Sequence, residues 1–167
     1  MGSERVVVVM GVTGTGKSTV GQLLAEELGV PYAEADEFHS PANIEKMRSG
    51  TPLTDEDRWP WLDAIGAWAA SRAGRGGVVS CSALKRVYRD RLRAAAPDLV
   101  LVHLTGSREL ITERQSAREG HFMPASLIDS QFATLEELGA DEAGVVVDVT
   151  PAPEEVAAQA LAGLRAL

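Results

Sequence analysis

The sequence predicts an α/β protein, a doubly wound sheet of about five parallel strands with helices on both faces. Two observations predict this fold. Short apolar runs alternate with amphipathic stretches, which is the rhythm of successive β-α-β units. The first run is followed at once by residues 11–18, which match the pattern GxxxxGK(S/T) of a phosphate-binding loop. With 167 residues the chain is long enough for one such domain and short for two, so we expect a single domain over residues 1–167.

The strands are expected where the chain is most apolar. Residues 6–10 form a β-branched run that is typical of a strand buried on both faces. Further strands are expected at residues 78–81, 99–104 and 145–149, joined by right-handed crossovers. Residues 30–35 are a weaker candidate, and their mixed character favours an edge of the sheet.

Helices are expected between these strands. Val20, Leu23, Leu24 and Leu28 recur at helical spacing after the loop, and Gly29 is expected to end this first helix. Amphipathic patterns predict further helices at residues 55–71, 83–96, 107–118 and 153–167.

Each residue type in the loop meets a demand of holding a triphosphate chain. Its glycines let backbone N–H groups point inward, and the helix that follows adds its positive N-terminal end. Lys17 supplies a cation for the β- and γ-phosphates, and the Ser18 hydroxyl can complete the shell of a Mg²⁺ ion. We therefore predict a P-loop NTPase. The residues expected to bind its nucleotide here are Gly11, Val12, Thr13, Gly14, Thr15, Gly16, Lys17, Ser18 and Thr19.

Composition narrows the class of protein. A net charge of -8 argues against a protein whose main role is binding nucleic acid, because phosphate backbones are captured by basic surfaces. The single cysteine, Cys81, rules out an intrachain disulfide framework and fits a reducing compartment. No secretory signal and no apolar run of membrane-spanning length is visible. We therefore expect a cytoplasmic protein with no nucleic-acid or membrane partner.

Two carboxylates follow the second predicted strand, and ligands in such a fold bind beyond the carboxyl ends of strands. Asp36 is predicted to orient an acceptor hydroxyl and accept its proton. Glu34 lies two residues earlier, on the same side of the strand, and is the candidate to hold Mg²⁺ through water. An acidic, solvated loop is the alternative, since the chain has 24 acidic residues.

Arg58 is predicted in the first turn of a helix capped by Thr54 or Asp55, where the helix dipole favours acids. A cation there suggests a ligand or an acidic partner. The alternative is an ordinary ion pair with Asp55 or Glu56. Lys85 follows the third strand, where it can meet an anionic group.

Arg114 and Arg118 lie one helical turn apart and therefore share a helix face. Gly120 follows as a flexible joint, so residues 114–135 are expected to form a lid. One arginine can stack on adenine, and the other can reach the transferring phosphoryl group as an arginine finger. A solvent-exposed basic face is the alternative.

Several stretches resemble the gluconokinases, small relatives of shikimate kinase and the nucleoside monophosphate kinases. The stretches are Asp36-x-x-His39, Gly50-x-Pro52-Leu53-x-Asp55-x-Asp57-Arg58, Cys81-Ser82-Ala83-Leu84-Lys85 with Tyr88-Arg89, and Gly120-His121-Phe122 followed by Ser130-Gln131-Phe132. The resemblance runs from about residue 6 to the C-terminus, and these stretches are more specific than the phosphate loop. It departs at Glu34, where relatives more often carry Asp.

The resemblance implies ATP- and Mg²⁺-dependent phosphorylation of D-gluconate at its 6-hydroxyl, by a homodimer. It places Asp36 at the acceptor hydroxyl, Arg58 at the gluconate carboxylate and Arg114 over the adenine. The substrate-binding region would span about residues 36–75. The implied set is completed by Lys17 and Arg118 as catalytic residues, by Ser18 and Glu34 at the metal, and by His39, Lys46, Lys85, His121 and Gln131 around the polyol. The alternatives are a kinase for another sugar acid or small alcohol, and a nucleotide-binding switch module.

Overall fold

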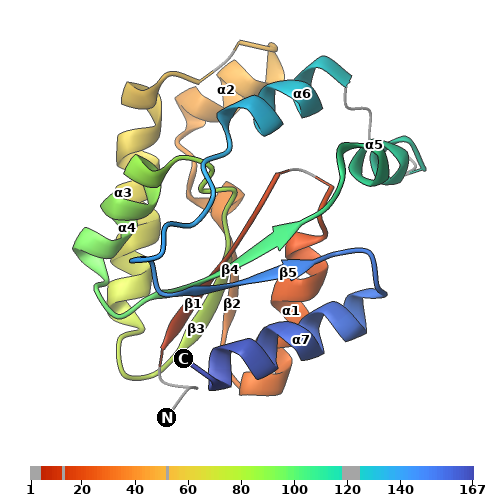
Figure 1. Cartoon of the computed structure of the whole chain (residues 1–167). Helices are drawn as coiled ribbons and strands as arrows, with labels where there is room; N and C mark the ends of the chain where they lie inside the picture. The colour runs from red at the N-terminus through yellow and green to blue at the C-terminus, as the bar shows by residue number, and fades with distance from the viewer. Residues whose placement is uncertain (1–4, 13, 52, 118–124) are drawn as a thin grey trace.

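The computed structural model describes residues 5–12, 14–51, 53–117 and 125–167 and contains a five-stranded parallel sheet (Figure 1). The strand order is β2-β3-β1-β4-β5, and every neighbouring pair is parallel. The predicted fold class is therefore confirmed, and the weak strand candidate does lie at an edge. The strands are β1 (Val6–Met10), β2 (Tyr32–Glu34), β3 (Gly77–Ser80), β4 (Val100–Thr105) and β5 (Gly144–Asp148).

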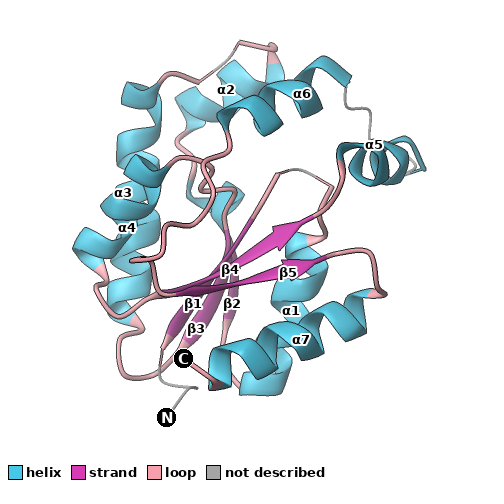
Figure 2. Ribbon diagram, in the orientation of Figure 1, coloured by secondary structure: helices cyan, strands magenta, loops and turns pink. Residues whose placement is uncertain are grey.

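Helices cover both faces of the sheet (Figure 2). The helices α1 (Lys17–Leu28) and α7 (Pro153–Arg165) pack on one face, and α3 (Asp55–Ser71) and α4 (Arg86–Ala95) pack on the other. The remaining elements are the 3₁₀ helix η2 (Ala35–Phe38), α2 (Pro41–Arg48), α5 (Arg108–Ala117) and α6 (Ala125–Thr134). Among the described residues, no helix combines the length and the apolar character that a membrane crossing requires.

Strand β1 explains why the sheet needs two helical layers. Its five residues are all buried, and successive side chains point to opposite faces. Val7 and Val9 join the cluster under α1 and α7, whereas Val8 and Met10 join the cluster under α3 and α4. An apolar run without alternation therefore becomes a central strand between two cores.

Three helices depart from the predicted pattern, and one of them is α6, whose residues were expected only as part of a lid. The helix expected at 83–96 begins only at Arg86, because residues 81–85 form a loop whose Ala83 and Leu84 carbonyls accept hydrogen bonds from the Arg89 guanidinium at 2.9 and 3.2 Å. The helix α2 was not expected. It begins at Pro41, where the Ser40 hydroxyl accepts a hydrogen bond from the Asn43 N–H at 3.1 Å, a normal N-cap.

Candidate active site

Three segments that carry predicted site residues follow the carboxyl ends of neighbouring strands, at one end of the sheet. The phosphate loop follows β1, the 3₁₀ helix η2 follows β2, and the loop 81–85 follows β3. The helices α2, α5 and α6 lie beyond this end of the sheet (Figure 1). This is the crevice in which open parallel sheets bind their ligands.

The phosphate loop has the backbone that its glycines predict. Gly11, Gly14 and Gly16 have φ angles of 149°, 84° and 85°, and a Cβ at Gly11 would lie 2.6 Å from a backbone carbonyl oxygen of β4. These positions therefore require glycine. Gly16 is also the N-cap of α1, so the start of that helix opens onto the loop.

Side chains of the loop close it on itself. The hydroxyl of buried Thr15 donates to the Val12 carbonyl at 2.8 Å, and the Lys17 ammonium donates to the same oxygen at 3.1 Å. Lys17 therefore lies across the loop, where a phosphate chain would be held. Ser18 and Thr19 are exposed in the first turn of α1, and Thr13 lies outside the described residues.

A hydrogen-bonded network ties Glu34 to the start of α1. The Tyr32 hydroxyl is 2.6 Å from a Glu34 carboxylate oxygen and 2.8 Å from the Ser80 hydroxyl, which donates to the Lys17 carbonyl at 2.9 Å. Burial and the Glu34 carboxylate raise the pKa of Tyr32 to about 12, while hydrogen bonds with Ser80 and Ser18 partly oppose the rise. The phenol is therefore protonated near neutral pH, and both Ser18 and Glu34 interact with it.

The oxygens of Ser18 and Glu34 are the donor type that Mg²⁺ prefers. Among the described residues, no group of three or more His, Cys, Asp or Glu side chains is arranged to hold a metal. A magnesium ion at a phosphate loop needs no such cage, since phosphate and water supply most of its ligands. The residues present therefore fit a nucleotide-bound Mg²⁺.

Lys17 and Asp36 follow the carboxyl ends of β1 and β2, the two strands that flank β3 in the sheet. Burial raises the pKa of the Cys81 thiol to about 12; the Ala83 backbone and the Lys17 charge lower it, and the Asp36 charge raises it. Both charges thus act on the same thiol at the end of β3. Asp36 itself is exposed in η2, which is anchored by the Trp61 indole N–H donating to the Ala35 carbonyl at 2.7 Å.

His39 extends the site from η2 towards α3. Its ring stacks on Trp61 with centroids 4.3 Å apart, and its Nδ1 is 3.4 Å from the Asn43 side-chain amide. Burial lowers the pKa of His39; Asp36 opposes this and Arg58 adds to it. The imidazole is therefore neutral near pH 7, and its pKa is affected by two residues predicted to bind substrate, Asp36 and Arg58.

Arg58 and Lys85 converge on Asp55. The Arg58 guanidinium is 3.7 Å and the Lys85 ammonium 3.6 Å from the same Asp55 oxygen. The Tyr88 hydroxyl donates to that oxygen at 2.6 Å and accepts from Arg58 at 3.1 Å. The pKa of Asp55 is lowered, first by Tyr88 and then by the two cations. The ion pair considered for Arg58 therefore exists, and it leaves two cations around one carboxylate.

Lys46, predicted to bind the polyol, pairs with a carboxylate of α3 in this structure. Its ammonium is 2.9 and 2.8 Å from the two carboxylate oxygens of Asp57. Asp57 also completes a capping box with Thr54 at the start of α3, and its pKa falls to about 2 through Lys46 first and Thr54 second. Lys46 thus braces α2 against α3 in this structure.

The remaining predicted residues belong to the segment that was expected to form a lid. Arg114 is on α5, with a guanidinium nitrogen 3.5 Å from the Thr150 carbonyl in the loop after β5. Gln131 is half-buried on α6. Arg118 and His121 lie outside the described residues. The structure therefore places Arg114 beside the loop that follows β5.

Sequence reasoning did not single out Tyr32 or Tyr88 as site residues, although each binds a charged residue that it did single out. A tyrosine in an apolar pattern is read as core, and only the folded chain shows which polar group its hydroxyl meets. The one available signal was the presence of Tyr88 in a stretch that carries the family resemblance.

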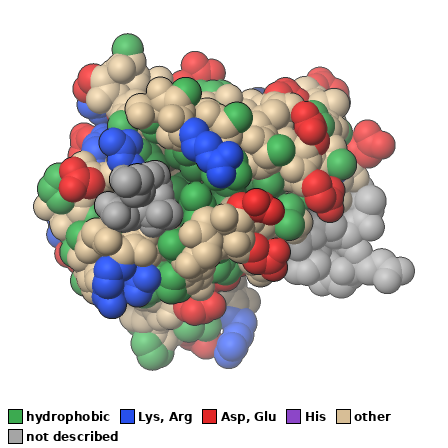
Figure 3. Space-filling model, turned by 90° about the horizontal axis from the view of Figure 1, so that it is seen from below, with side chains coloured by type: hydrophobic (Ala, Val, Ile, Leu, Met, Phe, Trp, Pro, Cys, Tyr) green, Lys and Arg blue, Asp and Glu red, His purple; other side chains and the backbone are tan. Residues whose placement is uncertain are grey.

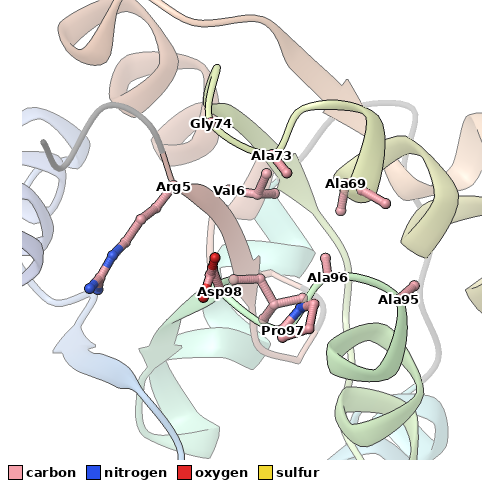
Figure 4. A pocket seen from close by; sticks show the side chains of 11 residues that line it. Arg5, Val6, Ala69, Ala73, Gly74, Ala95, Ala96, Pro97 and Asp98 are labelled. Atoms are coloured by element: carbon pink, nitrogen blue, oxygen red, sulfur yellow. The ribbon is translucent and has the colours of Figure 1, made fainter.

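A separate cavity of about 440 Å³ lies at the opposite end of the sheet (Figure 4). It is bounded by Val6 and by small side chains of α3 and α4 such as Ala69 and Ala95, with Arg5 and Asp98 among the residues that line it. The molecular face seen from below carries scattered acidic and basic side chains between apolar ones (Figure 3). None of the predicted site residues lines this cavity.

Comparison with known proteins identifies the family of the chain. The AAA domain family matches residues 6–138. A gluconokinase of Gluconobacter oxydans (strain 621H) is 49% identical over 154 residues, which cover 91% of this chain and 86% of that protein. The chain belongs to the gluconokinase family. The thermoresistant gluconokinase of Escherichia coli (strain K12) is 43% identical over 161 residues, covering 95% of this chain and 92% of that protein.

Solved structures extend this result to the fold. A gluconokinase from Sinorhizobium meliloti 1021 superposes with a TM-score of 0.91 at 52% identity, covering 98% of this chain and 93% of that chain. Shikimate kinase from Aquifex aeolicus shares the fold at 20% identity, with a TM-score of 0.65 and 96% coverage of both chains. This gluconokinase-family chain therefore has the shikimate kinase-like architecture that the sequence predicted.

Proposed function

We propose that this chain is a gluconokinase, which transfers the γ-phosphoryl group of ATP to the 6-hydroxyl of D-gluconate. In a chain of the gluconokinase family, one observation carries the proposal most directly. The Ser80 hydroxyl at the end of β3 donates to the Lys17 carbonyl at 2.9 Å, and Ser80 pairs in register with Glu34, two residues before Asp36. The phosphate loop and the segment that carries Asp36 therefore flank the same strand end. A phosphate donor and a proton acceptor are the two parts that a kinase site must bring together.

The donor half binds ATP through the loop residues 11–19. Backbone N–H groups and Lys17 hold the phosphates, and Arg114 covers the adenine beside Thr150. Ser18 and, through water, Glu34 would hold Mg²⁺, which supplies charge neutralisation at the β- and γ-phosphates when bound. Arg118 is proposed as the lid arginine that reaches the transferring group.

The acceptor half holds gluconate so that its 6-hydroxyl faces the γ-phosphate. Asp36 accepts the hydroxyl proton as the new O–P bond forms and the bond to the ADP oxygen breaks. Arg58 and Lys85 bind the substrate carboxylate. Both side chains lie near the same Asp55 oxygen, so two cations surround one carboxylate and a second carboxylate would balance their charge. His39, Lys46, His121 and Gln131 would hold the polyol. We place the substrate region at 36–75 and the lid at 114–135 in one kinase domain, 1–167.

An ADP-release assay with a panel of sugar acids and small alcohols tests this function. Gluconate should be the best substrate, and phosphorus NMR of the product should show a phosphate ester on the terminal carbon. Shikimate, and aldonic acids other than gluconate, serve as controls for specificity. Turnover with another substrate but not with gluconate, in a protein that binds ATP normally, would contradict the assignment.

We also infer a cytoplasmic homodimer without nucleic-acid or membrane partners. The single cysteine and the net charge of -8 support the location and the lack of nucleic-acid binding. Light scattering coupled to size-exclusion chromatography tests the oligomeric state.

A further inference from the structure

We propose that Tyr32 is a positioning residue of the kinase site, whose hydroxyl fixes the Glu34 carboxylate beside the phosphate loop. The inference rests on the proposed function, because it concerns the donor half of that site. It adds a residue that neither the motif nor the family resemblance assigns.

Close polar contacts around the phenol connect Glu34 to the loop, with the single phenol proton shared between Glu34 and Ser80. Tyr32 is 2.6 Å from Glu34 and 2.8 Å from Ser80, and the Ser80 hydroxyl donates to the carbonyl of Lys17 at 2.9 Å. Lys17 is the first residue of α1 and the lysine of the phosphate motif. The position of the Glu34 carboxylate is thereby coupled to the backbone that begins the phosphate-binding helix.

The packing of the ring shows that this arrangement is built into the fold. Glu34 pairs with Ser80 across the parallel strands, and Tyr32, two residues before Glu34, points to the same face. Gly21 of α1 lies directly above. A Cβ at Gly21 would be 2.6 Å from the Tyr32 ring and 2.7 Å from the Ser80 hydroxyl. A glycine at this turn of α1 therefore lets the ring and the hydroxyl lie against the helix.

A glutamate at this position benefits from such a partner. Its side chain has one more rotatable bond than aspartate, so an unrestrained carboxylate samples more positions. One hydrogen bond from the phenol restricts it and still leaves acceptor sites for a metal-bound water. Groups that orient metal-binding side chains in this way affect metal affinity, and their loss typically costs 10- to 100-fold.

The substitution Tyr32→Phe tests the proposal because it keeps the ring and removes only the hydroxyl. Calorimetric ADP binding should be measured with Mg²⁺ and with a chelator. We expect the ADP affinity in chelator to stay within about twofold of wild type, and the gain in affinity on adding Mg²⁺ to fall about tenfold. Tyr88→Phe is the matched control, since it removes a comparably placed phenol hydroxyl on the acceptor side and should leave both ADP affinities unchanged.

A second background separates positioning from packing. Glu34→Asp shortens the side chain so that its carboxylate no longer reaches the phenol. If Tyr32 acts through Glu34, adding Tyr32→Phe to this variant changes the Mg²⁺ gain by less than twofold. The proposal would be overturned if Tyr32→Phe reduced the Mg²⁺ gain equally in wild type and in Glu34→Asp. It would also be overturned if Tyr32→Phe lowered ADP affinity equally with and without Mg²⁺, or did not lower it at all. These measurements contain no gluconate, so they stay independent of the sugar-acid assay that tests the proposed function.

Discussion

Glu142 offers a sharp test of what holds the acceptor loop in place, through the substitution Glu142→Gln. Its carboxylate and the guanidinium of Arg89 are both fully buried, and they form two hydrogen bonds of 2.8 and 3.1 Å. Arg89 also donates to the carbonyls of Ala83, Leu84 and Glu137. One buried cation therefore joins α4, the loop that carries Lys85 and the segment after α6.

The expected cost follows from burial. Gln keeps the size of the side chain but removes its charge, which leaves the Arg89 guanidinium buried without a counter-ion. Breaking a buried ion pair in this way costs about 3–5 kcal/mol. The pKa of Glu142 supports the same scale: burial raises it, but hydrogen bonds from Arg89, the Gly139 N–H and Arg93 outweigh burial and lower it from 4.5 to about 2. That difference corresponds to about 3 kcal/mol.

The sign of the pH dependence follows from the lowered pKa. Glu142 binds protons more weakly in the folded than in the unfolded chain, so its contribution is complete above pH 4.5 and is lost as the pH falls towards 2. Urea unfolding of wild type and Glu142→Gln should therefore differ by about 3 kcal/mol at pH 7. This difference should shrink below pH 4.5. The control Asp141→Asn breaks an exposed pair with Arg86 and should change stability little.

Equal stability of wild type and Glu142→Gln at pH 7 would refute the reasoning about the buried pair. A difference that stays constant down to pH 2.5 would refute the assigned pKa instead. Activity provides the link to function. Arg89 holds the Ala83 and Leu84 carbonyls, which belong to the loop that carries Lys85. In the folded Glu142→Gln variant, the affinity for gluconate should therefore fall by a larger factor than the affinity for ADP.

Three further substitutions test the assigned roles. Asp36→Asn should keep ADP binding but lower kcat by about two to four powers of ten, the usual range for a lost general base, and wild-type turnover would remove Asp36 from that role. Arg58→Lys should mainly raise the gluconate KM, since a point charge cannot replace a planar fork, whereas an unchanged KM would indicate only the pair with Asp55. Trp61→Phe leaves the Ala35 carbonyl without its 2.7 Å donor, so thermal or urea unfolding should show a loss of about 1–3 kcal/mol. The same variant should lower kcat if η2 positions Asp36.

The strand pattern was predictable because burial on two faces leaves a clear signal in the sequence. Residues 6–10 had to be central, and the mixed residues 30–35 had to be at an edge, as the strand order confirms. The start of α4 was not predictable. Helical periodicity extends back to residue 83, but contacts made by Arg89 and by the Glu136 N–H, which donates to the Leu84 carbonyl at 2.7 Å, hold 81–85 as a loop. Such tertiary contacts override local preference.

One part of the candidate site was likewise predictable from the sequence, and another part was not. The loop motif located the phosphate site, because each of its glycines answers a local backbone demand that the structure shows. The pair of Arg58 with Asp55 was one of two alternatives that the sequence offered, but the partner of Lys46 was not foreseen. Lys46 meets Asp57 only because α2 folds back against the start of α3, which no spacing along the chain encodes. Sequence reasoning therefore found the cations but left open whether each faces a ligand or a neighbour.

The cluster around Asp55 concentrates positive charge in a protein whose net charge is -8, as the proposed binding of a sugar acid requires. Arg58 and Lys85 together carry two positive charges, and Asp55 remains ionised because Tyr88 and both cations lower its pKa. The cluster alone is thus left with one unbalanced positive charge. A sugar acid would bring the second carboxylate and make the cluster neutral, whereas a sugar alcohol of the same length would leave the charge unbalanced. The electrostatics of these three side chains therefore favour an acid over an uncharged polyol, independently of how the hydroxyl groups are held.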